Sequence, residues 1–123
     1  MPLCIAAGGL VVALAANAFT LAWTHSIEKI RWEEDYRVQD GRLRLVEARI
    51  AGSGAGMEPP PGSRLEGGVW HYVPRLAPLE ELRLTRSDFT AGYELCIDGA
   101  CSPLAHYAAR AHSGDVIRVT ACP

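Results

Sequence analysis

Three two-residue turn signals constrain the fold of this 123-residue chain more than any other feature. Gly8-Gly9, Asp40-Gly41 and Asp98-Gly99 each separate two short stretches rich in apolar residues. A type I′ hairpin turn requires positive φ at both central positions, and Gly, Asn and Asp adopt positive φ most readily. The three pairs therefore predict three β-hairpins, and the third places Cys96 opposite Cys101.

Residues 1–19 are apolar and contain Ala-x-Ala spacings that resemble a signal-peptidase site. They contain no Lys or Arg, and Gly8-Gly9 interrupts the apolar run. A secretory signal needs a positive first region, and a spanning helix needs about 20 apolar residues. We therefore expect a hairpin, with an export or membrane segment as the alternative. The expected location is the cytoplasm, free or at the inner membrane, and the alternative is the periplasm.

The remaining pattern favours an all-β fold. The apolar side of residues 42–50 shifts from Leu43 and Leu45 to Val46, Ala48 and Ile50, which predicts a bulge near Leu45-Val46. Residues 51–68 are rich in Gly and Pro and predict a long loop. We expect an antiparallel β-sandwich or a partly open barrel of about seven to nine short strands, with at most one or two helical turns.

Composition bounds the organisation and the partners. The chain is 49% hydrophobic and 21% charged, with a net charge of −2, which is typical of one packed domain over residues 1–123. The arginines are scattered along the sequence, so a nucleic-acid binder is not expected.

Residues 19–38 predict two strands whose apolar rows are each interrupted by one ionisable residue, His25 in the first and Glu34 in the second. An even-numbered loop puts both rows on one face of the sheet. A four-residue loop places His25 opposite Glu34, and a two-residue loop makes them diagonal neighbours. Because a buried imidazole or carboxylate is costly alone, we expect the two to be partners. The rows are, in chain order, Phe19, Leu21, Trp23, His25, Ile27 and Ile30, Trp32, Glu34, Tyr36, Val38.

Three interpretations of the pair remain open. It could fix strand register, bind a polar ligand among Trp23, Trp32 and Tyr36, or serve acid/base catalysis in a small hydrolase or isomerase with Glu34 as base and His25 as acid. Ser26 and Glu28 point to the other face of a regular strand and join the site only if the strand ends or kinks at Ile27. For the same reason His25 and Glu28 do not predict a metal site.

The glycine-rich loop that contains Gly54, Ala55 and Gly56 allows the φ values of an anion-binding nest. It lacks the Lys-Ser/Thr of a P-loop, and a flexible connection is the alternative.

The four cysteines lack paired Cys-x-x-Cys units, so zinc is not expected. Cys96 and Cys101 could form a disulfide if the compartment allows it, and two reduced thiols are the alternative. No metal or other cofactor is predicted.

The chain resembles a bacterial family of domains of unknown function, DUF1850. The resemblance rests on "FTLAWTHSIEK", "WEEDYRV", "GSGAGM" and "GGVWHY". His25, Ser26, Ile27, Glu28, Glu34 and Gly54 to Gly56 fall on what look like its signature positions.

The resemblance implies a small β-rich domain encoded beside or with TRAP-type transporters of the TAXI class, which carry organic acids. It implies no established activity. We therefore expect a non-enzymatic accessory module that binds a small carboxylate, or a TRAP-type permease or solute-binding component. The expected site residues are His25, Glu34, Gly54, Ala55 and Gly56, flanked by Ser26 and Glu28. A purely structural partner that docks on a permease is a further alternative.

Overall fold

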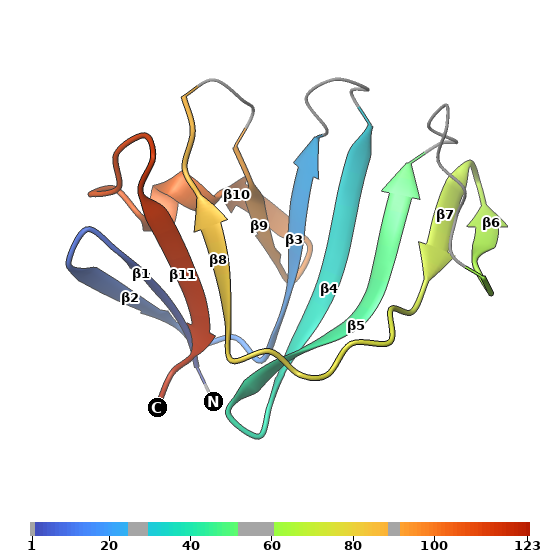
Figure 1. The fold of residues 1–123 in the computed structure, drawn as a ribbon, viewed down its shortest axis with the longest axis horizontal. Coiled ribbons are helices and arrows are strands. Elements are labelled where there is room, and N and C mark those ends of the chain that lie inside the picture. Colours follow the sequence, from blue (N-terminus) through green and yellow to red (C-terminus); the bar gives the residue numbers. More distant parts are fainter. Residues whose placement is uncertain (1, 25–29, 52–60, 89–91) are drawn as a thin grey trace.

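Two antiparallel β-sheets form the protein (Figure 1). The structure, a computed structural model, describes residues 2–24, 30–51, 61–88 and 92–123. These residues form β1 Leu3–Ala7, β2 Leu10–Leu14, β3 Ala18–Thr24, β4 Arg31–Gln39, β5 Arg42–Ala51, β6 Arg64–Glu66, β7 Val69–Tyr72, β8 Glu81–Thr85, β9 Glu94–Ile97, β10 Ala100–Pro103, the 3₁₀ helix η1 Leu104–Tyr107 and β11 Val116–Ala121.

The strand order is β2-β1-β11-β8 in one sheet and β10-β9-β3-β4-β5-β7-β6 in the other. The sheets do not close into a barrel, and β7 and β6 lie at the end of the larger sheet farthest from the smaller one (Figure 1). The predicted all-β antiparallel architecture is confirmed. We call the side of the larger sheet that faces the smaller sheet its inner face, and the opposite side its outer face.

The three predicted hairpin turns are confirmed. Gly8-Gly9 joins β1 to β2, Asp40-Gly41 joins β4 to β5, and Asp98-Gly99 joins β9 to β10. All six residues have positive φ, from 51° at Asp98 to 81° at Gly99. The predicted bulge is also confirmed, because Asp35 pairs with Glu47 while Tyr36 pairs with Leu45, which leaves Val46 as the extra residue.

Two sequence-based predictions need correction. The β3–β4 register places Leu21, not His25, opposite Glu34, and Trp23 opposite Trp32. The strands are thus connected by more residues than the two or four predicted. Within the predicted loop 51–68, residues 64–66 form β6, because the turn at Gly67-Gly68 folds this segment back onto β7.

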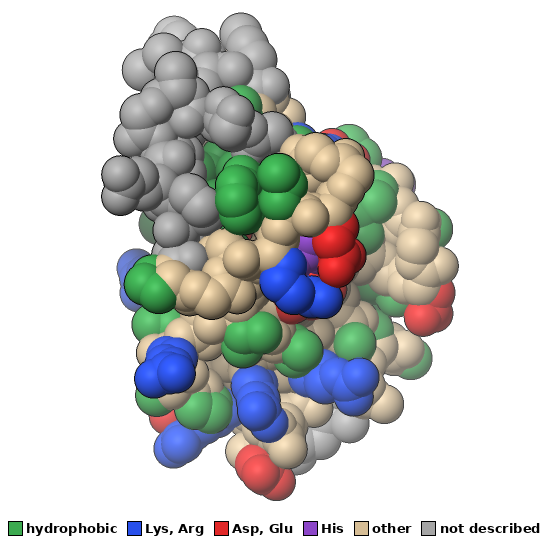
Figure 2. Space-filling model, turned by 90° about the vertical axis from the view of Figure 1, so that its right-hand side faces the viewer, with side chains coloured by type: hydrophobic (Ala, Val, Ile, Leu, Met, Phe, Trp, Pro, Cys, Tyr) green, Lys and Arg blue, Asp and Glu red, His purple; other side chains and the backbone are tan. Residues whose placement is uncertain are grey.

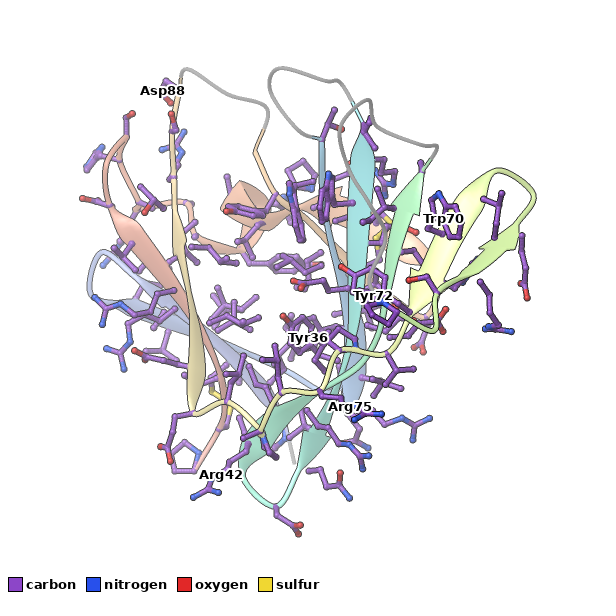
Figure 3. The ribbon with its side chains drawn as sticks, turned by 45° about the vertical axis from the view of Figure 1, so that its right-hand side comes forward. Tyr36, Arg42, Trp70, Tyr72, Arg75 and Asp88 are labelled. Atoms are coloured by element: carbon purple, nitrogen blue, oxygen red, sulfur yellow. A yellow bond between two sulfur atoms is a disulfide. The ribbon has the colours of Figure 1, made fainter. Side chains whose placement is uncertain are left out.

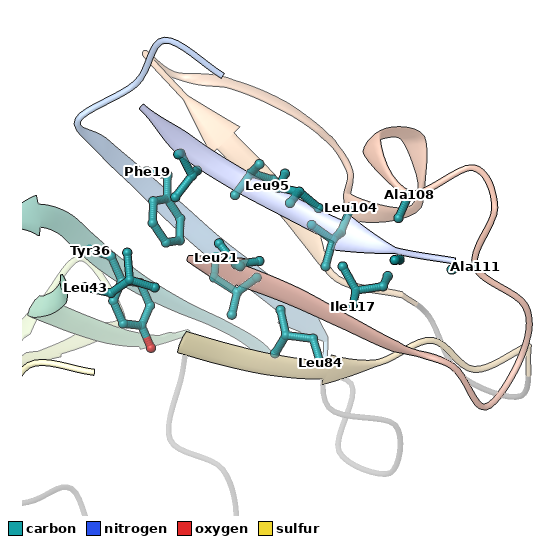
Figure 4. Close-up of a cluster of buried hydrophobic side chains, with 14 of the residues drawn as sticks. Phe19, Leu21, Tyr36, Leu43, Leu84, Leu95, Leu104, Ala108, Ala111 and Ile117 are labelled. Carbon is teal, nitrogen blue, oxygen red and sulfur yellow. The ribbon is translucent and has the colours of Figure 1, made fainter. Parts of the chain in front are cut away.

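Apolar side chains from both sheets form one core between them (Figure 4). Leu3 of β1 and Val119 of β11 are fully buried, as are Leu43 and Leu95 of the larger sheet. Alternate residues of a strand point to the same face, so each strand contributes every second residue to this core.

Two disulfides join all four cysteines. Cys96 and Cys101 are linked across the β9–β10 hairpin, and Cys4 is linked to Cys122 near the two ends of the chain. The sequence pattern did not indicate the second bond. Among the described residues, no helix is long and apolar enough to cross a membrane.

The two disulfides are expected to differ in their effect on stability. Replacing both Cys4 and Cys122 with Ser opens a loop with a sequence separation of 118, against 5 for Cys96 and Cys101. Loop-closure entropy predicts a loss of about 5 kcal/mol in the free energy of unfolding for the first pair and about 2 kcal/mol for the second. Urea unfolding of the two double variants would measure this order, and a larger loss from the short loop would contradict it.

Gly8 and Gly9 provide a matched pair of substitutions. A Cβ at Gly8 would lie 2.7 Å from the carbonyl oxygen of Arg110, whereas nothing lies within 4 Å at Gly9. Gly9→Ala should cost about 1 kcal/mol from its positive φ alone. Gly8→Ala should cost at least about 1 kcal/mol more, because backbone must shift. Chemical denaturation of both variants tests the difference, and equal losses would be inconsistent with the contact.

Candidate functional site

Glu34 lies on the inner face of β4, between Leu21 of β3 and Ala48 of β5. Tyr72 of β7 is the next residue in this row, because it pairs with Ala48. Trp32 and Tyr36 lie two residues away from Glu34 on the same side of β4. We refer to Trp32, Glu34, Tyr36 and Tyr72 as the Glu34 site. Two of its members, Tyr36 of β4 and Tyr72 of β7, are labelled in Figure 3.

The Glu34 carboxyl is half-buried and accepts a hydrogen bond from Tyr36. The Tyr36 hydroxyl donates this bond to Oε1 over 3.0 Å. Burial raises the pKa of Glu34, and the hydrogen bond from Tyr36 offsets only part of that rise. Burial also raises the pKa of Tyr72, and the nearby Glu34 charge adds to it. The site therefore favours the neutral form of each of these groups.

Trp32 brings a second unusual group to the site. Its indole Nε1 is buried and has no hydrogen-bond partner among the described residues. The Trp32 ring stacks on Trp23, with centroids 6.1 Å apart and an interplanar angle of 15°, and Trp23 meets Tyr93 edge to face at 6.0 Å. A buried N–H without an acceptor is costly, so this donor would be stabilised by an acceptor that the described residues do not supply.

The outer face of the same strands carries a ladder of ion pairs. Arg49 binds both carboxylate oxygens of Asp35, at 2.6 and 2.7 Å, and also contacts Glu33 at 3.0 Å. The hydrogen bonds from Arg49, more than that from Thr20, hold the pKa of Asp35 below its usual value. The pKa of Glu33 is also lowered, because Arg49 and Arg31 outweigh the effect of burial. This ladder fixes β4 against β5 behind the Glu34 site.

Of the predicted site residues, only Glu34 lies in the described part of the chain. His25, Ser26 and Glu28, and the loop residues Gly54, Ala55 and Gly56, fall outside it. The register that would place His25 directly opposite Glu34 is wrong, since Leu21 occupies that position. The prediction that Glu34 interrupts an apolar row on one sheet face agrees with the observed pairing.

Sequence reasoning missed one group of the Glu34 site and one group on the outer face behind it. The sequence did not predict that Tyr72 lies near Glu34. Trp70 and Tyr72 are two residues apart in a short strand, and this spacing does predict that both rings lie on one face. His71, on the outer face, forms a hydrogen bond of 2.5 Å between its Nδ1 and Glu47 Oε1. No spacing in the sequence could have paired β7 with β5, because the connection between them is long. Within the described residues, no cluster of three or more His, Cys, Asp or Glu could hold a metal ion.

Comparison with known families gives one match. Residues 19–104 match the family described as "Domain of unknown function (DUF1850)", which covers the strands of the Glu34 site. No curated protein and no solved structure matches the chain.

The raised pKa of Glu34 has a consequence for stability. An acid whose pKa is higher in the folded protein destabilises the fold when it ionises, so this cost grows as pH rises through that pKa. Glu34→Gln should therefore increase the free energy of unfolding at pH 7, and the gain should vanish in acid, where the wild-type carboxyl is protonated.

Urea unfolding at pH 7 and below pH 4 would measure this effect. Glu80→Gln is the matched control, because the Glu80 side chain is 83% exposed and should show little change at either pH. A gain for Glu34→Gln that persists unchanged in acid would contradict this electrostatic origin.

Proposed function

The chain belongs to the DUF1850 family, and from this premise we propose that it is a non-enzymatic accessory module that binds a small organic acid at the Glu34 site. The observation that carries the proposal is that one side of β4 holds two unusual groups. Trp32 Nε1 is a buried donor without a described acceptor, and the Glu34 carboxyl has a raised pKa. Trp32 and Glu34 lie on one side of β4, with their Cα atoms about 7 Å apart along the strand.

These two groups suit a carboxylate ligand. An indole N–H donates a hydrogen bond to a carboxylate oxygen, and a protonated Glu34 can donate another. The charge of the ligand would be met by these hydrogen bonds and by the proton on Glu34. The rings of Trp23, Trp32 and Tyr72 would contact the apolar part of the ligand.

Binding is better supported than acid/base catalysis. Catalysis with Glu34 as base needs a second proton-transfer group, and His25, the residue expected for that role, lies outside the described residues. Tyr36 is the described group bonded to Glu34, and burial raises its pKa. A phenol of this kind holds its proton and positions the carboxyl.

The proposed partner is a permease or solute-binding component of a TRAP-type transporter of the TAXI class, which follows from the resemblance given above. The two disulfides support an oxidising compartment such as the periplasm, in place of the cytoplasm expected from the N-terminal sequence. A module that presents an organic acid to a transporter would be exposed to such a compartment.

Calorimetric titration with dicarboxylates, beginning with succinate, tests the proposed ligand. Wild-type affinity should fall about tenfold for each pH unit above the pKa of Glu34, because binding requires its proton. Glu34→Gln should bind without this pH dependence, since an amide cannot ionise. Trp32→Phe keeps an aromatic ring but removes the donor, and it should bind about 10-fold more weakly or worse.

Glu80→Gln serves as the control and should behave as the wild type. Affinity that rises with pH, together with loss of binding in Glu34→Gln, would instead indicate a cationic ligand group on ionised Glu34. No binding of any dicarboxylate by the wild type between pH 4 and 7 would reject the proposal.

A further inference from the structure

Two arginines face each other on the outer face of the β4–β5 hairpin. Arg37 pairs with Arg44 across the two strands, and both side chains are exposed. Like charges at directly opposite positions of an antiparallel pair repel each other and destabilise the sheet. A bound anion would relieve this repulsion.

The smaller sheet contains a second cross-strand arginine pair that has its counterion. Arg83 of β8 pairs with Arg118 of β11. Glu81 lies between their guanidinium groups, 2.9 Å from Nε of Arg118 and 3.3 Å from Nη1 of Arg83. Hydrogen bonds from these arginines, that of Arg118 first, hold the pKa of Glu81 below its usual value. One carboxylate thus bridges two opposed arginines in this protein.

The Arg37–Arg44 pair has no such carboxylate within the described residues. No ion pair joins Arg37 to an acid, and Arg44 instead donates a hydrogen bond of 3.4 Å to Oε1 of Gln39, which is neutral. Asp35, two residues from Arg37 on the same face, is occupied by Arg49 and Thr20. The nearest internal acid on β4 is therefore already committed elsewhere.

The two arginines border a surface hollow of about 580 Å³. The described residues around it contribute no acidic side chain, and Val46, the bulge residue, gives it an apolar wall. Figure 2 shows several basic side chains gathered in the lower half of the face next to β6 and β7. The lining residues are Asn17, Arg37, Val38, Gln39, Arg44 and Val46.

We propose that Arg37 and Arg44 form an oxyanion site, which takes a carboxylate or phosphate group in the position that Glu81 occupies between Arg83 and Arg118. Planar guanidinium groups bind such oxyanions through paired, charge-assisted hydrogen bonds. The site is separate from the Glu34 site, because Arg37 and Tyr36 are neighbours on β4 and point to opposite faces. The proposed oxyanion site therefore does not depend on the ligand proposed for the Glu34 site.

Inorganic phosphate is the first probe, added in place of chloride at constant ionic strength. Phosphate should raise the melting temperature of the wild type, and Arg44→Gln and Arg37→Gln should each lose most of this rise. In titration calorimetry, either substitution should weaken phosphate binding about 10-fold or more. In dilute chloride both variants should be at least as stable as the wild type, since one of two repelling charges is gone.

Substitutions in the Arg83–Arg118 pair provide the matched controls. Arg83→Gln should keep the full phosphate response, because Glu81 already occupies that pair. Glu81→Gln should gain a second response, and the double variant Glu81→Gln/Arg83→Gln should lose it again. Glu34→Gln should leave the response of the Arg37–Arg44 site unchanged.

Sedimentation with vesicles that contain phosphatidylglycerol separates two sources of the oxyanion. Retention of the wild type, but not of Arg44→Gln, would assign the group to a lipid headgroup, and phosphate binding without retention would assign it to a soluble anion. Equal phosphate responses in the wild type, Arg37→Gln and Arg44→Gln would overturn the proposal. No response of the wild type to phosphate or to vesicles would also overturn it.

Discussion

The antiparallel pairing of β3 with β4 is the constraint on which both the core and the Glu34 site depend. At one end of this pairing, Phe19 stacks on Tyr36 with ring centroids 5.2 Å apart, and at the other end Trp23 stacks on Trp32. Glu34 lies between the two stacked pairs. Because side chains alternate along a strand, a slip of β4 by one residue would separate both aromatic pairs and move Glu34 to the outer face. The aromatic stacks therefore fix the position of the acid as well as the register.

The bulge at Val46 sets the chemistry of the opposite face. On one side of it, Glu33 lies opposite Arg49 and Asp35 lies opposite Glu47, and Arg49 binds both Glu33 and Asp35. On the other side, the shifted register brings Arg44 opposite Arg37. One extra residue thus divides the outer face into a ladder of ion pairs around Arg49 and a pair of arginines that form no ion pair with a described acid. A regular strand would have sent these side chains to other partners.

The sequence predicts local features of this fold well, because the chemistry of a turn is contained in two residues. Positive φ at Asp98-Gly99 is a property of those residues, and the Cys96–Cys101 register follows from it. The β3–β4 register is different, because the connecting segment holds no Gly, Asn or Pro to define its length. The row pattern showed that Glu34 shares a face with Trp23, but could not show that Leu21 is its partner. Long-range neighbours such as Tyr72 depend on strand order, which no local pattern encodes.

Three consecutive acids on β4 show that the pKa of a carboxyl depends on the face of the sheet on which it lies. The pKa of Glu34 lies above its ordinary value of 4.5, whereas the pKa of Asp35 lies below its ordinary value of 3.8 and that of Glu33 is also lowered. Stability from the depressed pKa values is present above their unfolded values and is lost only when pH falls through the folded ones. Glu34 therefore takes up its proton at a pH where the Arg49 ladder on the outer face is still ionised and intact. Protonation of Glu34 on the inner face therefore leaves the ion pairs that hold β4 and β5 together on the outer face in place.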